Sequence, residues 1–224
     1  MIESQVMSVD TLLVFLALVM FGAAVQTITG FAIGLMIVAG IAALNLVDIA
    51  FGAAVISLIS LLNTIIALRS TYKLVDWQKV GLISAGLMPL LISGVWILEL
   101  LSDEFYWVLR RLLGVVIVAA GVMLMVTPKP FAQTSSRLAF VSCGAIGGVI
   151  AGLYSAGGAP LAYFMYRQPE SVQVIRASLL AIFFVSTFWR AMVVGVAGHI
   201  NLEVLTTTLM AIPVVVITTV ATTR

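Results

Sequence analysis

The chain has 224 residues, of which 62% are hydrophobic and only 9% are charged. Because a soluble globular domain carries about 45–50% apolar and about 25% charged residues, this composition excludes a soluble enzyme, a disordered chain and a nucleic-acid-binding protein. The 11 basic and 9 acidic residues give a net charge of +2, which provides no basic surface for a nucleic-acid partner. The single cysteine, Cys143, excludes a disulfide framework and a cysteine metal cluster, and no cofactor is expected.

Apolar segments separated by short polar breaks define the expected elements. A membrane-spanning helix needs about 20 predominantly apolar residues, so the chain has room for roughly eight or nine segments. They cover 11–28, 29–45, 49–68, 79–98, 105–126, 138–154, 156–166, 174–197 and 203–222. Lipid-exposed backbone must satisfy its own hydrogen bonds, and no alternating barrel pattern is present. The sequence therefore predicts an all-α polytopic membrane protein embedded in the lipid bilayer.

Two of these segments are unusually short and follow a long apolar run without a polar break. The first, 29–45, begins with TGFAIG, and the second, 156–166, follows a serine and begins with AGGAP. Both are punctuated by helix-breaking residues: Gly30, Gly34, Gly157, Gly158 and Pro160. Since glycine and proline interrupt helices, we expect one broken, glycine-rich helix in each half of the chain. We also expect the two broken segments to meet near the membrane midplane, as in secondary transporters.

The chain also repeats itself weakly when it is shifted by about 124 residues, which suggests an internal structural repeat. The shift places Gly34 on Gly158, Asn63 on Thr187, Pro89 on Pro213, and Asp76 beside Asn201. We therefore expect two homologous halves, 1–130 and 131–224, within one integral membrane domain. The second half has no counterpart of segment 105–126, and truncation after Arg224 is favoured over a natural absence of the last helix.

The positions of the basic residues predict the orientation, because cytoplasmic loops carry an excess of Lys and Arg. With one crossing per segment and the N-terminus outside, the Arg69–Lys79 loop and the later basic breaks face the cytoplasm. The two halves are then oppositely oriented, which is an inverted repeat typical of secondary transporters. We expect the chain to be an integral protein of a cell (inner) membrane. If the two short segments were re-entrant, Arg167 and Arg176 would instead lie outside.

The stretch 151–201 carries a pattern of small residues that resembles a known family. Its elements are Gly157–Gly158, Pro160, Ala177–Ser178–Leu179 and Gly198–His199. This pattern resembles the second half of the TauE/SafE family of sulfite exporters, and TGFAIG at 29–34 is similar to a degenerate copy of the same turn. The resemblance covers about 22–222, although Ala159 replaces the usual third glycine and Ala32–Ile33 replace glycines in the first copy.

The resemblance implies a membrane transporter of small sulfur-containing anions of the sulfite, sulfonate or sulfoacetate type, and not an enzyme. It also implies a further helix at the end of the chain. No Asp or Glu falls at the centre of a span, so no proton-coupling carboxylate is visible. A membrane potential that is negative inside favours outward movement of an anion, with a free energy of about 2.3 kcal/mol per charge per 100 mV. This favours export or potential-driven facilitated movement.

Arg190 is the most informative candidate for binding the small anionic substrate, because it lies in the middle of the segment FFVSTFWRAMVV. An arginine at a span centre costs about 2.5–3.5 kcal/mol on insertion scales and usually faces a cavity or another helix. Its guanidinium matches sulfonate or sulfite oxygens bidentately. The alternative is a structural arginine that caps the carbonyls of a broken helix or reaches the membrane surface.

The helix breaks supply the next candidates, because exposed N–H groups at a helix end bind anions. The remaining candidate substrate-binding residues are Gln26, Thr29, Gly30, Asn63, Ser155, Gly157, Gly158, Ser178 and Thr187. Close helix packing explains the glycines equally well, and contact between helices is the favoured explanation for Asn63. The chain could also be a permease for another small organic anion, or a membrane-embedded subunit or assembly partner without transport activity of its own. A homodimer is a further open arrangement.

Overall fold

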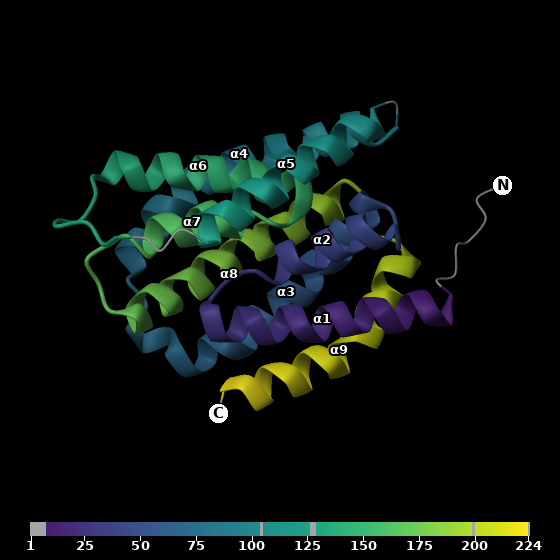
Figure 1. The fold of residues 1–224 in the computed structure, drawn as a ribbon, viewed down its shortest axis with the longest axis horizontal. Coiled ribbons are helices and arrows are strands. Elements are labelled where there is room, and N and C mark those ends of the chain that lie inside the picture. Colours follow the sequence, from purple (N-terminus) through teal and green to yellow (C-terminus); the bar gives the residue numbers. More distant parts are fainter. Residues whose placement is uncertain (1–7, 104, 126–128, 199, 224) are drawn as a thin grey trace.

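The computed structural model describes residues 8–103, 105–125, 129–198 and 200–223. Within these residues every regular element is a helix, which confirms the predicted all-α fold (Figure 1). The elements are α1 (Val9–Thr29), α2 (Ile33–Leu44), α3 (Ile49–Thr71), η1 (Tyr72–Leu74), α4 (Trp77–Asp103), α5 (Tyr106–Met125), α6 (Arg137–Tyr154), α7 (Gly158–Met165), α8 (Val172–Val196) and α9 (Leu202–Thr223). Glu104, His199 and Arg224 lie outside the described residues.

Six helices of the described part of the chain are long and apolar enough to cross a bilayer: α1, α3 with η1, α4, α6, α8 and α9. In contrast, α2 has 12 residues and α7 has 8. Straight helices of these lengths reach only about 18 and 12 Å, less than a hydrocarbon core about 30 Å thick. The two short apolar segments are therefore incomplete spans, and the family turn lies at the start of each.

Each short helix folds back along the helix before it. Gly22 of α1 packs against Ile33 at the start of α2, and Leu18 packs against Gly40 further along α2, so the two helices run antiparallel. In the second half, Leu161 of α7 packs on Gly147 of α6. The glycines allow this close return, because a Cβ atom on Gly40 or Gly147 would press on a leucine side chain of the partner helix.

The breaks lie where the glycines predict them, but two of the three left-handed residues that form them are not glycines. Gly30 ends α1 with φ of 87°, and Ala32 starts α2 with φ of 93°. Ser155 ends α6 in the left-handed region with φ of 55°. No side chain caps the N-terminus of α2 or of α7. The first N–H groups of both short helices therefore lack the usual side-chain acceptor inside the protein.

The closest helix pair is α4 with α6, which lie together in the upper part of Figure 1. A Cβ atom on Gly86 would lie 2.0 Å from the Val141 carbonyl oxygen, and one on Gly144 would lie 2.0 Å from the Ile83 carbonyl oxygen. A Cβ atom on Gly148 or Gly152, further along α6, would likewise lie too close to a backbone oxygen of α4. This small-residue seam, in which backbones touch, is the usual way in which helices associate in lipid.

The order of the helices repeats along the chain. A long helix, a short one, a long one and a long one with an internal proline follow one another as α1 to α4 and again as α6 to α9. The prolines are Pro89 in α4 and Pro213 in α9. The packing is repeated as well: α4, the last helix of the first set, packs on α6, the first helix of the second set, and α9 packs on α1 in the same way (Figure 1). Among the described elements, α5 has no counterpart in the second half.

The two ends of the bundle differ in charge. One end, called the basic end below, gathers η1, the starts of α4, α6 and α8, and the segment after α7. It carries the basic residues Arg69, Lys73, Lys79, Lys129, Arg137, Arg167 and Arg176. The opposite end holds the starts of α3 and α9 and the end of α4, with Asp48, Glu99 and Glu203. Asp76 and Glu170 also lie at the basic end and Arg110 lies near Asp48 at the other, so the two ends differ in the balance of charge, not in a complete separation of sign.

Candidate functional site

The two helix breaks meet inside the protein. A Cβ atom on Gly34 would lie only 1.9 Å from the carbonyl oxygen of Ser155, so the start of α2 touches the end of α6. The start of α7 is equally enclosed, since a Cβ on Gly158 would contact the rings of Phe183 and Phe31. The sequence-based expectation that the two broken segments approach one another is confirmed.

Arg190 lies in α8 beside this junction and is 1% exposed. Its Nε and Nη2 atoms donate to the carbonyl oxygen of Gly152 at 3.2 and 3.1 Å. Its Nη1 atom donates to the carbonyl oxygen of Ala53 at 2.7 Å and to the hydroxyl of Ser57. That hydroxyl lies 3.3 Å from the hydroxyl of Ser155. Arg190 thus links α8 to α3 and to the second helix break.

Gly152 lies in the last turn of α6, where backbone carbonyls have no partner within the helix. Arg190 therefore does cap a broken helix, as the structural alternative for this residue requires. The capping does not neutralise it, because carbonyls and a hydroxyl carry no net charge. Among the described residues, the ion pairs are made by Lys79 and none involves Arg190. A full positive charge therefore lies buried without a carboxylate.

A pocket of about 560 Å³ reaches this arginine. Residues of α3, α4, α8 and α9 line it, among them Ala54, Val95, Arg190 and the acidic Glu99. Exposed Ala197 and Asn201 also belong to its lining and lie between α8 and α9, at the end opposite the basic end. The pocket thus runs from that end of the bundle inward to Arg190. A guanidinium has five N–H donors, and the hydrogen bonds described above leave one on Nη2 available.

The residues around the first break are differently placed. Gln26 is 1% exposed, and neither its amide oxygen nor its amide nitrogen has a hydrogen-bond partner in the described part of the chain. The hydroxyl of Thr29 contacts the carbonyl oxygens of Val25 and Phe31, so it is used locally. Gly30 is required by its positive φ and by the backbone of α8, which passes close to it. None of these residues lines the Arg190 pocket.

Three further candidates lie away from the pocket. Asn63 accepts hydrogen bonds from Thr27 at 3.2 Å and from Thr219 at 3.0 Å, and so joins α3 to α1 and α9. Thr187 donates to carbonyls of its own helix. Ser178 lies about 18 Å from Arg190 along α8, because twelve residues separate them at about 1.5 Å each. Its hydroxyl accepts a hydrogen bond from the backbone N–H of Asp76 at 3.0 Å.

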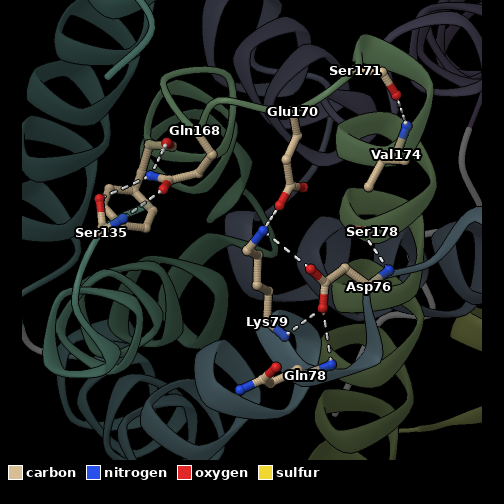
Figure 2. A network of polar contacts seen from close by, with 10 residues as sticks. Asp76, Gln78, Lys79, Ser135, Gln168, Glu170, Ser171, Val174 and Ser178 are labelled. Carbon is tan, nitrogen blue, oxygen red and sulfur yellow. Dashed lines mark hydrogen bonds and ion pairs between the residues drawn. The ribbon is translucent and has the colours of Figure 1, made fainter. Parts of the chain in front are cut away.

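Ser178 belongs to a polar cluster at the basic end that the sequence reasoning did not anticipate (Figure 2). Lys79 of α4 forms ion pairs with Asp76, at 3.1 Å, and with Glu170, which precedes α8. Nearby, the side chain of Gln168 bonds to the backbone and hydroxyl of Ser135. Lys79 and Glu170 lie in different polar breaks, where charged residues are normally solvated, so no local pattern signals their pairing.

The environment of Asp76 alters its titration. Burial alone would raise the pKa of this carboxyl, but hydrogen bonds from the backbone and ammonium of Lys79 and from the backbone of Gln78 outweigh it. The pKa of Asp76 is therefore lowered from its usual value of 3.8. Asp76 stays ionised near neutral pH and keeps both its role as the cap of α4 and its ion pair with Lys79.

Comparison with known proteins agrees with this architecture. The profile of the family "Sulfite exporter TauE/SafE" matches residues 14–223. A protein of Cupriavidus necator described as "Probable sulfite/organosulfonate exporter TauE" is 35% identical over 203 residues, which cover 91% of this chain and 79% of that protein. No solved structure matches the chain. Because the family profile matches nearly the whole length of this chain, the chain belongs to the TauE/SafE family of sulfite exporter-type membrane transporters.

Proposed function

We propose that the chain transports small sulfur-containing anions, of the sulfite, sulfonate or sulfoacetate type, and that the substrate binds beside Arg190. The observation that carries this proposal is a buried guanidinium without a carboxylate partner at the inner end of a pocket. Leaving a buried charge uncompensated is strongly destabilising, and a bound anion removes that cost. The relative from Cupriavidus necator, whose name specifies sulfite or organosulfonate, supports the substrate class.

The starts of the two short helices add positive potential near Arg190, while Arg190 itself offsets the negative C-terminal end of α6. The N-terminus of a helix carries a partial positive charge and N–H groups that bind anions. The short helices α2 and α7 both begin at the junction with uncapped N-termini, at Ile33 and at Gly158. In this proposal Arg190 and Ser155 bind the anion directly, while the starts of α2 and α7 lower its energy electrostatically.

The arrangement of the helices supports alternating access. We propose that the halves 1–130 and 131–224 are related as inverted repeats, because the order and packing of α1 to α4 recur in α6 to α9. The basic end then faces the cytoplasm of a cell whose inner membrane holds the protein, following the distribution of Lys and Arg. A potential that is negative inside favours outward movement of the anion, so export is the proposed direction.

Flux of radiolabelled sulfite or sulfoacetate into proteoliposomes under an imposed potential tests the proposal. Arg190→Gln and Arg190→Lys should each lower the flux by about tenfold or more. Glutamine carries no charge, and an ammonium with three donors cannot keep the contacts to Gly152, Ala53 and Ser57 while it also donates to the anion. Arg111→Gln is the matched control, since Arg111 lies over the ring of Trp107 outside the pocket and its loss should leave flux unchanged.

Thermal unfolding in detergent separates lost function from lost structure. If Arg190→Lys stays folded and transports as well as the wild type, Arg190 does not bind the substrate. If the folded wild type moves neither anion under any potential, the proposed substrate class is wrong, and other small organic anions come next.

A further inference from the structure

The contact between the starts of α4 and α8 is the central feature of the basic end. The backbone N–H of Asp76 donates to the hydroxyl of Ser178, which is fully buried. Lys79 then bridges from Asp76 to Glu170, with only 10% of its own side chain and 19% of that of Glu170 exposed. Figure 2 shows the carboxylates of Asp76 and Glu170 meeting at the ammonium of Lys79, while the backbone nitrogen of Asp76 is turned toward Ser178. These four residues are called the Lys79 latch below.

The other end of the bundle has a matching pair of helix starts, those of α9 and α3. Asp76 caps α4 by accepting from the N–H groups of Gln78 and Lys79, both at 3.1 Å. In the corresponding place, Asn201 caps α9 by accepting from the N–H of Val204 at 2.9 Å. A shift of about 124 residues, the spacing of the internal repeat, places Ser178 on Ala54 of α3. The counterpart of the Asp76–Ser178 contact is therefore the pair Asn201 and Ala54.

The Asp76–Ser178 pair and its counterpart, Asn201 and Ala54, differ in their contacts. At the basic end the pair Asp76 and Ser178 is in hydrogen-bond contact. At the opposite end Asn201 and Ala54 both line the pocket of about 560 Å³, so the matched place there adjoins open space. A two-fold related protein that is closed at one site and open at the matched site has the asymmetry that an alternating-access transporter needs.

We infer that the Lys79 latch is the gate at the basic end of the anion pathway, held shut here while the pathway is open from the opposite end to Arg190. This inference rests on the proposed transport function. Opening requires the starts of α4 and α8 to separate, which breaks the Asp76–Ser178 hydrogen bond and the Lys79–Glu170 ion pair. Closing of the pocket between Asn201 and Ala54 accompanies it, since the two halves exchange conformations.

Accessibility of single cysteines to a charged, membrane-impermeant thiol reagent tests the gate without any substrate. Cys143→Ala provides a cysteine-free background, because Cys143 is the one cysteine of the chain. Ala54→Cys then reports on the pocket, and Ala181→Cys reports on the basic end. Ala181 is 1% exposed and lies one turn inward from Ser178 on α8. Right-side-out and inside-out vesicles present the two ends of the bundle separately.

With the latch intact, Ala54→Cys should be labelled from the end opposite the basic end, and Ala181→Cys should be protected. Lys79→Gln should raise labelling of Ala181→Cys about tenfold or more and lower labelling of Ala54→Cys, because breaking a buried ion pair shifts the two-state population. Lys73→Gln is the matched control. Lys73 lies over the ring of Tyr72 at the same end, outside the latch, and its substitution should change neither rate.

A conservative variant guards against simple misfolding. Lys79→Arg keeps the positive charge that pairs with Asp76 and Glu170, so it should preserve the protection of Ala181→Cys, whereas Lys79→Gln and Glu170→Gln should each remove it. Unchanged labelling in every latch variant would overturn the gate, even if flux depends on Arg190. Conversely, the expected labelling pattern without flux of sulfite or sulfoacetate would leave the gate standing and reject the substrate class.

Discussion

The carbonyl oxygen of Gly152 accepts two hydrogen bonds from one side chain, from Nε and Nη2 of Arg190. This contact ties the centre of α8 to the last turn of α6, immediately before the second helix break. Because the same guanidinium also reaches α3 through Ala53 and Ser57, three helices share one charge. An anion that draws on the remaining N–H group of Arg190 therefore acts on the position of all three.

Removing the one side-chain acceptor of Arg190 should weaken the site without abolishing it. Ser57→Ala is expected to lower the free energy of unfolding by about 1.5–3 kcal/mol, the usual contribution of a hydrogen bond to a charged group. Ser60→Ala is the control, since Ser60 is equally buried in α3 and makes no bond to Arg190. Thermal unfolding in detergent measures both, and equal effects would show that Ser57 does not hold the guanidinium.

The glycine seam between α4 and α6 predicts opposite effects of the same substitution within one helix. Gly86→Ala should destabilise the protein by about 1–3 kcal/mol or more, because its new Cβ would lie on a backbone oxygen of α6. Gly81→Ala, also in α4, meets nothing within 4 Å and should stabilise by about 0.5–1 kcal/mol through helix propensity. Thermal unfolding of the two variants provides the test. The packing assigned to α4 is wrong if both change stability in the same direction.

Asn63 should behave as a contact between helices and not as a substrate ligand. Asn63→Leu removes the acceptor of Thr27 and Thr219, but both hydroxyls also bond to carbonyls of their own helices. The expected loss of stability is therefore modest, about 1–2 kcal/mol, close to that of a single hydrogen bond. The KM for anion flux should stay unchanged, and a large rise in KM in a folded variant would place Asn63 in the binding site.

The lowered pKa of Asp76 predicts a dependence of stability on pH. A carboxyl whose pKa is depressed in the folded state contributes stability above its usual pKa of 3.8 and loses it as the pH falls through the folded value. Asp76→Asn can still cap α4 but cannot pair with Lys79. The wild type should therefore be more stable than this variant at pH 7, and the difference should shrink below about pH 4. A difference that persists into strong acid would contradict the pairing.

The sequence predicted the helices and the two breaks because both depend on local composition. Long apolar runs between charged residues can only be helices in lipid, and Gly30, Gly34 and Gly158 mark the interruptions. The meeting of the breaks followed from their matched positions in the two halves. The roles of the individual substrate-binding candidates stay predictions until flux of the variants is measured.

Other contacts could not be predicted, for two physical reasons. Arg190 is held largely by main-chain carbonyls, which every residue possesses, so nothing in the identity of residue 53 or 152 marks it as a partner. The pairing of Lys79 with Glu170 depends on how α4 packs against α8 and the segment before it, which only the tertiary structure determines. From the sequence alone, Lys79 and Glu170 look like ordinary solvated residues in the polar breaks between helices.

The acceptors of Arg190 have one more property, which concerns the order of synthesis. Ala53, Ser57 and Gly152 all precede Arg190 in the chain, and they lie in helices that enter the membrane before α8 does. A growing chain adds its N-terminal parts first. All the acceptors that stabilise the buried charge of α8 are therefore already synthesised when the ribosome reaches Arg190.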